Sequence, residues 1–357
     1  MPYDRGMAIG AGHALAVGFD GTVIPDDIAA LAEQSGLGGV ILFARNCPSL
    51  EIVLALTTAA RRLGPDVLVM VDHEGGRVHR LPPPFTRFPP PATVGRSGDL
   101  RLAAAVARAM ARELRAAGFD SGLAPVLDCL VNPASTVIGD RAFATAPDVV
   151  AGCGVASVEA MLGEGLLPVA KHFPGHGRAS VDSHQELPEI GATMDDLTRG
   201  DLVPFRAALG AGCPAVLVAH VRYPALDPEL PASLSPEVIG RLLRRRLSFS
   251  GLVLSDDLEM AAVAGTWGVA GAARRFLSAG GDLALVCRRA DARSETLAAI
   301  GQDIDRGALD LAPAVRRRQA VRRLVDTAGP GPDVAVIGCA EHRALAEEVA
   351  RRAAERA

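Results

Sequence analysis

The stretch "LLPVAKHFPGHG" (166–177) shows the pattern on which the fold prediction rests. A short apolar run ends in the polar pair Lys171-His172, and a loop rich in Gly and Pro follows it. The chain has eight such short apolar runs, at 13–19, 39–44, 66–72, 122–128, 166–172, 215–221, 251–257 and 282–287. Stretches long enough for crossover helices lie between most of them, at 51–63, 98–117, 147–163, 195–210, 235–246 and 291–305. Eight alternating units predict a (β/α)8 TIM barrel rather than a doubly wound sheet.

The chain divides unequally on this interpretation. Residues 1–328 form the barrel, which is the catalytic domain if the protein is an enzyme. Residues 329–357 read as a C-terminal extension made of a linker, a short strand and a final helix. This extension either packs on the barrel or is the remnant of a second domain.

The composition argues against several classes of partner. A net charge of -4 gives no electrostatic reason to expect nucleic acid or a membrane surface, and the arginine runs at 241–247 and 315–323 read as solvated helix faces. No apolar run reaches the length of a membrane helix, and the N-terminus lacks the pattern of a secretory leader. The six cysteines form no CxxC pair, which suits a reducing compartment. We therefore expect a cytoplasmic protein that binds a small molecule; the sequence carries no signal for its oligomeric state.

One lysine stands out. The chain has 37 lysine and arginine residues, and Lys171 is the only lysine among them. A codon bias explains the scarcity, so Lys171 survives either by chance or because arginine cannot replace it. An ammonium group is a compact donor, whereas guanidinium is a planar fork that needs more room. The position of Lys171 therefore indicates a tight polar pocket.

Polar side chains end five of the eight runs. They are Asp72, Asp128, Lys171-His172, His220 and Asp256-Asp257. In a barrel the carboxyl ends of the strands meet at one mouth, where active sites are built. Some of these residues could instead cap the helices that follow, but five runs with the same feature favour a shared site.

The loop that follows the fifth run, 171–184, allows two interpretations. His172 and His176 have the spacing of helical zinc ligands, but Pro174, Gly175 and Gly177 make a helix there improbable, so we predict no metal and no cofactor. Alternatively, Asp182 orients His184, whose ring then exchanges a proton with a substrate. The alternative is that His184 has only a structural role, with its ring held by a local hydrogen bond.

Asp256 completes a possible catalytic pair with this histidine. An ionised aspartate opposite a proton-donating histidine is the arrangement that a double-displacement glycosidase requires. One group attacks the anomeric carbon, and the other protonates the leaving oxygen and then activates water. A histidine acid also avoids like-charge coupling with the nucleophile.

Six ordered motifs carry a resemblance to a known family. They are "GGVILFARN" (38–46), "VDHEGGRVHR" (71–80), "GDRAF" (139–143), "KHFPGHG" (171–177), "VDSH" (181–184) and "SDDLEM" (255–260). Together they resemble the glycoside hydrolase family 3 β-N-acetylglucosaminidases over about residues 13 to 290. The chain departs from many relatives at Arg178 and Ala179, where an acidic residue and threonine are usual.

The resemblance implies roles for the residues at matching positions. Asp256 would be the nucleophile, and His184 the general acid/base with Asp182 as its partner. A terminal N-acetylglucosamine would be held by a further group of side chains, Asp72, Arg80, Arg141, Lys171 and His172. For Asp72, Arg80 and Arg141 a structural ion-pair network is the alternative reading. The stretch "EGGR" (74–77) reads as a tight turn rather than a phosphate cradle, because the helix start and the lysine of a P-loop are missing.

The resemblance thus implies a retaining exo-β-N-acetylglucosaminidase that acts on small glycosides such as peptidoglycan fragments, as in cell-wall recycling. Two other functions stay open at this point. A phosphorylase would use the same residues with phosphate as the acceptor, since a histidine acid/base does not repel phosphate. A non-catalytic sugar-binding barrel is the third possibility.

Overall fold

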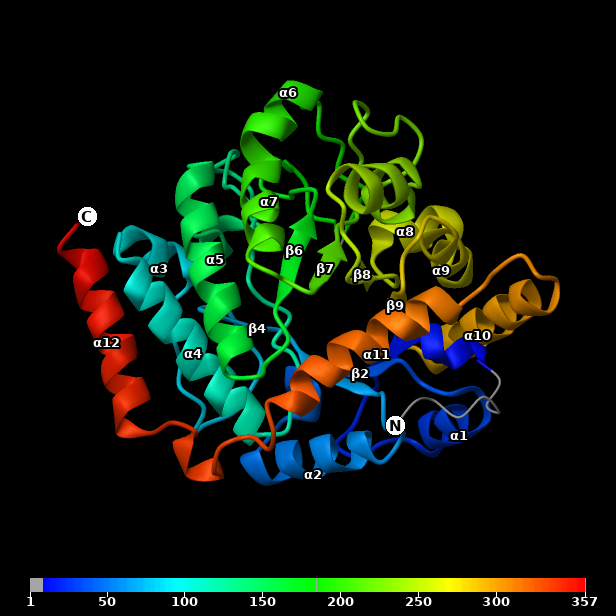
Figure 1. The fold of residues 1–357 in the computed structure, drawn as a ribbon, viewed down its shortest axis with the longest axis horizontal. Helices are drawn as coiled ribbons and strands as arrows, with labels where there is room; N and C mark the ends of the chain where they lie inside the picture. The colour runs from blue at the N-terminus through cyan, green and yellow to red at the C-terminus, as the bar shows by residue number, and fades with distance from the viewer. Residues whose placement is uncertain (1–8, 184, 357) are drawn as a thin grey trace.

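The computed structural model describes residues 9–183 and 185–356. Within them, one parallel sheet of seven strands lies at the centre, with helices around it (Figure 1). Its order is β3 (Leu68–Val71), β2 (Gly39–Leu42), β1 (Leu15–Val17), β9 (Leu283–Val286), β8 (Leu252–Asp257), β7 (Ala215–Val218) and β6 (Val169–Phe173). The seven strands match seven of the eight predicted runs, so the predicted α/β class is confirmed.

The helices follow the strands in chain order. Six of their regions were predicted from amphipathic stretches. The helices are α1 (Asp26–Ser35), α2 (Leu50–Arg61), α3 (Pro91–Arg96), α4 (Leu100–Ala116), α5 (Pro147–Gly163), α6 (Met194–Asp196), α7 (Leu202–Gly210), η6 (Glu237–Arg246), α8 (Ala261–Trp267), α9 (Val269–Ser278), α10 (Ala290–Asp305), α11 (Ala312–Thr327) and α12 (Ala340–Ala354).

Both faces of the sheet are buried, which explains why the strands are continuous apolar runs. Alternate side chains of each strand belong to different clusters. Leu283 and Leu285 of β9 pack with Leu254 of β8 in one cluster, while Ala284 and Val286 belong to the cluster that includes the surrounding helices. The sheet is therefore curled around an apolar core of its own.

The fourth predicted run, 122–128, is not a strand, and this prediction was wrong. The segment still hydrogen-bonds to both edges of the sheet: Val71 N–H donates to Ser121, and Val169 N–H donates to the carbonyl of Ala124 at 2.7 Å. Leu123 has a φ of 43° in the left-handed region, and Pro125 has no N–H to donate. These two residues prevent a regular ladder, although the chain runs where an eighth strand would lie.

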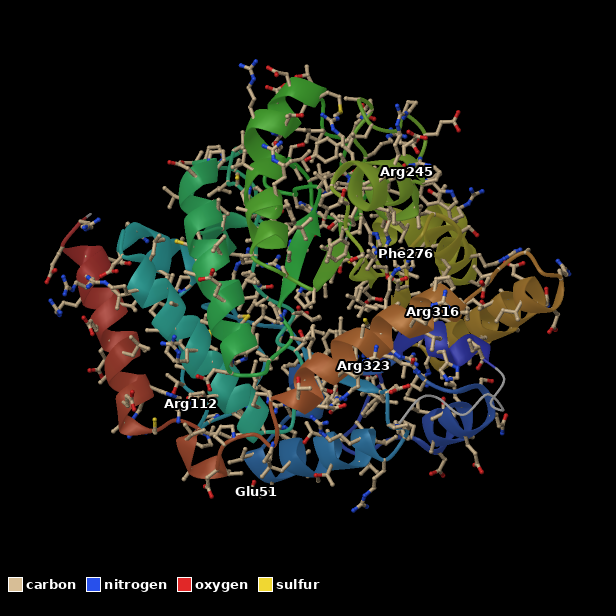
Figure 2. All side chains as sticks on the ribbon, in the orientation of Figure 1. Glu51, Arg112, Arg245, Phe276, Arg316 and Arg323 are labelled. Atoms are coloured by element: carbon tan, nitrogen blue, oxygen red, sulfur yellow. The ribbon has the colours of Figure 1, made fainter. Side chains whose placement is uncertain are left out.

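Helix α11 crosses the amino ends of the strands. Arg317 contacts Asp282, which precedes β9, and Arg322 contacts Asp120, which precedes the irregular segment, both at 2.8 Å or less. The prediction that this arginine-rich stretch is a solvated face is only partly right. Arg316 and Arg323 lie outward on α11 (Figure 2), but Arg322 is buried.

The strand predicted in the C-terminal extension is also absent. Val334–Val336 form a 3-10 turn, because the Asp333 carboxylate accepts from the N–H of Ala335 and caps a helical turn. Helix α12 then lies along α3 and α4 (Figure 1). The His342 ring contacts the buried Glu113 of α4 at 2.8 Å and anchors this helix.

Candidate active site

The cavity at the carboxyl ends of the strands has a volume of about 430 Å³. Seven of the eight predicted site residues line it: Asp72, Arg80, Arg141, Lys171, His172, Asp182 and Asp256. The eighth, His184, lies outside the described residues. Side chains from segments far apart in the sequence thus meet at one mouth, as the strand-end pattern predicted.

Lys171 is buried at the edge of this cavity on β6. Its Nζ lies 2.8 Å from Asp72 Oδ1 and 2.5 Å from Glu74 Oε1. Burial alone would lower the pKa of Lys171, but these two carboxylates raise it, so the ammonium keeps its charge. The register of β6 against β7 shifts between Ala170 and Phe173, and both Lys171 and His172 line the cavity.

Glu74 is a functional residue that the sequence reasoning missed. It belongs to the hairpin β4 (His73–Gly75) and β5 (Val78–His79), whose turn uses Gly75 and Gly76 at positive φ. The motif "EGGR" was correctly interpreted as a tight turn, but its acidic residue was not considered. Glu74 lies two residues after Asp72, and a pair of acids at i and i+2 beside an extended segment was the signal available.

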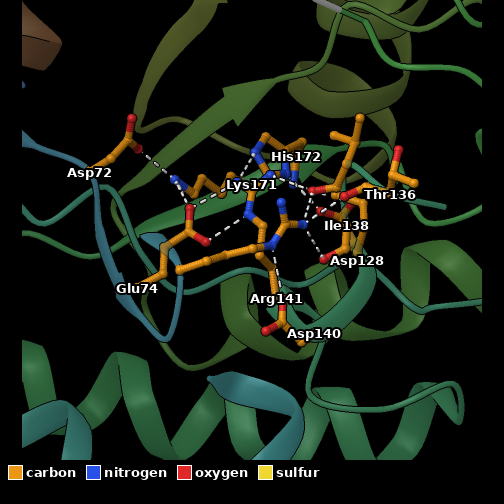
Figure 3. Close-up of polar contacts among 11 residues, drawn as sticks. Asp72, Glu74, Asp128, Thr136, Ile138, Asp140, Arg141, Lys171 and His172 are labelled. Carbon is orange, nitrogen blue, oxygen red and sulfur yellow. Dashed lines mark hydrogen bonds and ion pairs between the residues drawn. The ribbon is translucent and has the colours of Figure 1, made fainter. Parts of the chain in front are cut away.

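Glu74 joins two cations beside the cavity (Figure 3). Arg141 donates to it twice, from Nε to Oε2 and from Nη2 to Oε1, each at 2.8 Å. Burial alone would raise the pKa of Glu74, but Arg141 and Lys171 lower it far below its usual range. The carboxylate is therefore ionised and cannot act as a proton donor at neutral pH.

His172 continues the network on the other side of Arg141. Its Nε2 lies 3.1 Å from Arg141 Nη2, and its Nδ1 lies 2.6 Å from Asp128 Oδ2. The other oxygen of Asp128 accepts from the backbone N–H of His176 at 2.6 Å. Burial would raise the pKa of Asp128, but His172 lowers it. Asp128, noted in the sequence only as the end of a run, thus does not line the cavity itself but holds His172, which does.

Asp256 lies at the carboxyl end of β8. Its Oδ1 accepts from the N–H of Asp257 at 2.9 Å, and the backbone of Asp257 is held in turn by His220, whose Nε2 lies 3.0 Å from the Asp257 carbonyl. Burial alone would raise the pKa of Asp256, but His220 and His172 lower it. An ionised carboxylate therefore faces the cavity.

Asp257 differs from its neighbour although both line the cavity. Burial raises the pKa of Asp257 to about 7. In the sequence the two aspartates are alike as polar residues at a strand end, whereas their surroundings give them different charges near neutral pH.

Two predicted site residues, Asp182 and Arg80, remain, together with Arg178 in the loop after β6. Asp182 lines the cavity, and its carbonyl accepts from the N–H of Gln185 at 2.9 Å. Arg80 also lines the cavity, and among the described residues its Nε has no hydrogen-bond partner. Arg178, a departure from the family pattern, forms a 2.8 Å ion pair with the buried Asp201.

The helical zinc-ligand alternative does not match the loop. His172 lies in strand β6, and His176 lies in the irregular segment that follows this strand. Their ring centroids are 6.0 Å apart. Across residues 9–183 and 185–356, no group of three or more His, Cys, Asp or Glu side chains is placed to hold a metal ion.

Comparison with known proteins matches residues 16–326 to the sequence profile of the family described as "Glycosyl hydrolase family 3 N terminal domain". The chain belongs to glycosyl hydrolase family 3. A protein named Beta-hexosaminidase from Methylococcus capsulatus is 43% identical over 266 residues, covering 74% of this chain and 79% of that protein. A second Beta-hexosaminidase, from Xylella fastidiosa, is 39% identical and covers 83% of this family 3 chain and 92% of its own length.

Solved structures agree with this family 3 assignment. A family 3 β-N-acetylglucosaminidase from Paenibacillus superimposes with a TM-score of 0.91 at 33% identity, covering 96% of this chain and 68% of that one. NagZ from Neisseria gonorrhoeae gives 0.80 at 33% identity, covering 95% and 97%. The resemblance read from the six motifs is therefore confirmed, and the protein is a glycoside hydrolase. In the described part of this family 3 chain, no helix is long and apolar enough to cross a membrane.

Proposed function

We propose that the chain is a retaining exo-β-N-acetylglucosaminidase that releases terminal β-linked N-acetylglucosamine from small glycosides such as peptidoglycan fragments. The observation that carries this proposal is the ionised carboxylate of Asp256 in a cavity that Lys171 and the polar side chains beside it also line. The names of the relatives from Methylococcus and Paenibacillus support the substrate class.

The reaction proceeds by double displacement. Asp256 Oδ attacks the anomeric carbon as the bond to the leaving oxygen breaks, and a glycosyl-enzyme ester forms. In this proposal His184, oriented by Asp182, gives its proton to the leaving oxygen and then takes one from the water that hydrolyses the ester. When water breaks the ester bond, the ionised carboxylate of Asp256 is regenerated, and the released sugar has the β configuration.

The polar network holds the sugar. Lys171 presents a compact donor, Asp72 an acceptor and Arg141 further donors at the cavity, so several ring hydroxyls are bound at once. His172 also lines the cavity and contributes to sugar binding by holding Arg141 in position. Arg80 supplies a guanidinium at the cavity. Because Glu74 and Asp128 fix these groups before substrate arrives, little ordering is left to binding.

The proposal includes a closed barrel. The irregular segment 120–127 takes the place of an eighth strand and closes the barrel, which its hydrogen bonds to β3 and β6 support.

The proposal also places the enzyme in the cytoplasm. The cysteines of the described residues are all free thiols, which supports a reducing compartment.

The deciding experiment compares an aryl N-acetyl-β-glucosaminide with the matching β-glucoside, with and without phosphate, and identifies the products. Free N-acetylglucosamine at a rate independent of phosphate is the expected result. A phosphate-dependent rate that yields sugar 1-phosphate would make the enzyme a phosphorylase with the same site. Tight sugar binding without turnover would point to a non-catalytic sugar-binding barrel.

A further inference from the structure

The ring of His172 lies between a carboxylate and a guanidinium. Asp128 Oδ2 is 2.6 Å from Nδ1, and Arg141 Nη2 is 3.1 Å from Nε2. A guanidinium has only donors, so the contact with Arg141 requires Nε2 to accept. A carboxylate has only acceptors, so the contact with Asp128 requires Nδ1 to carry the proton. The two contacts together select one tautomer of a neutral ring.

Asp128 cannot rotate away from this role. Its side chain is fully buried, and its Oδ1 accepts from the backbone N–H of His176 at 2.6 Å while Oδ2 faces the ring. A backbone N–H donates in every protonation state, so Oδ1 is committed to His176. Only Oδ2 is left for the ring of His172.

We propose that Asp128 is a positioning residue that fixes the proton of His172 on Nδ1 and so keeps Nε2 available as the acceptor for Arg141. The consequence reaches further along the network. Arg141 Nη2 has two hydrogens, and it donates one to His172 and one to Glu74 Oε1 at 2.8 Å. Asp128 thereby sets the direction of a chain of hydrogen bonds that continues through Glu74 to Lys171. The effect of this chain on sugar binding rests on the function proposed above, but the tautomer does not.

Asp128→Asn tests the assignment because the amide keeps the shape of the carboxylate. The amide oxygen must stay opposite the N–H of His176, so the NH₂ group turns toward His172 Nδ1. That nitrogen must then accept, and the proton moves to Nε2, where it opposes a donor hydrogen of Arg141. The variant therefore inverts the tautomer and breaks the contact with Arg141 without removing a single heavy-atom position.

The tautomer is read directly by ¹⁵N NMR of the ring nitrogens in the unliganded, histidine-labelled protein at neutral pH. The chain has 8 histidines, and a His172→Gln variant assigns the signal. We expect a protonated Nδ1 and an unprotonated Nε2 in the wild type, and the reverse in Asp128→Asn. A wild-type ring protonated on Nε2, or a variant with an unchanged pattern, would overturn the proposal. The wild-type spectrum decides it even if the variant does not fold.

Asp282→Asn is the matched control. Asp282 is also a buried aspartate that accepts from a backbone N–H, that of Val253 at 2.8 Å, and from arginines, but it lies at the amino end of β9. We expect this variant to lose stability and keep the wild-type pattern of His172.

A second readout connects the tautomer to binding. With N-acetylglucosamine as a competitive inhibitor, Asp128→Asn should raise the inhibition constant by about ten- to a hundredfold, by analogy with the cost of losing a carboxylate that orients a metal-bound histidine. The KM should rise more than kcat falls, and Asp282→Asn should change neither. If the wild type does not bind the sugar at all, the proposed function fails while the NMR result still stands.

Discussion

Glu74 and Arg141 form a buried, doubly hydrogen-bonded ion pair beside the cavity at the carboxyl ends of the strands, with both N···O distances at 2.8 Å. Glu74 and Arg141 come from segments far apart in the sequence, so the pair ties the hairpin after β3 to the turn at 139–141. The geometry has the planar, parallel form in which guanidinium and carboxylate interact most strongly.

Glu74→Gln should weaken both the fold and the site. The amide has one acceptor for Arg141 and Lys171 together, so a buried cation is left without its full set of partners. Breaking a buried pair costs about 3–5 kcal/mol, and we expect a loss of stability of that order with a raised KM. Chemical denaturation and steady-state kinetics measure the two effects.

Glu237→Gln provides the comparison for this loss. Glu237 pairs with Arg241 at 2.9 Å on the exposed side of η6, and such surface pairs contribute about 0–1 kcal/mol. Equal destabilisation in both variants would contradict the special role given to the Glu74 pair.

Lys171→Arg should impair sugar binding although the charge is kept. The lysine side chain is only 2% exposed, and its Nζ already contacts two carboxylates at 2.8 and 2.5 Å. A guanidinium needs more space and a flat partner, so it must displace Asp72 or Glu74. We expect KM to rise by at least about tenfold, which corresponds to 1.4 kcal/mol. Unchanged KM and kcat would show that the lone lysine is an accident of codon use.

The parts of this molecule that were predictable are those with a local signal. Seven strands were visible because both of their faces are buried, and Asp72, Lys171 and Asp256 were visible because polar groups interrupt such runs at their carboxyl ends. The remaining run, 122–128, had the same apolar composition, but Leu123 and Pro125 change the backbone without changing the pattern.

Partnerships across the chain had no such signal. Glu74 appeared to be part of a glycine turn, and only the folded chain brings it to Arg141 and Lys171. Arg322 appeared to be solvated, because the sequence does not show that α11 lies over the amino ends of the strands. The chemistry of His184 stays a prediction from its motif.

Asp257→Asn should change how stability depends on pH. Since burial raises the pKa of Asp257 to about 7 from an unfolded value near 4, the folded protein binds the proton more tightly. Its contribution is fully present below pH 4 and is lost as pH rises through 7. The variant carries no charge at any pH, so it should gain stability over the wild type between pH 5 and pH 8, on the order of 2 kcal/mol.

Denaturation midpoints of both proteins across that pH range measure this difference. Asp303→Asn controls for loss of an aspartate as such. Asp303 does not line the cavity, and its Oδ2 lies 2.5 Å from Arg274 Nε. A difference between wild type and Asp257→Asn that stays constant from pH 5 to pH 8 would exclude a proton on Asp257.

Asp256→Ala should abolish turnover and leave the fold intact. The carboxylate is the only group in the proposed reaction that bonds to the anomeric carbon, so kcat should fall by at least about 10⁴-fold, as when a nucleophile is removed from other enzymes. Added azide should restore part of the rate by entering the space of the carboxylate, and it should give the α-glycosyl azide because only one displacement then occurs. Circular dichroism and inhibition by N-acetylglucosamine show whether fold and sugar site persist. Activity above a few per cent without azide would assign the nucleophile to another residue.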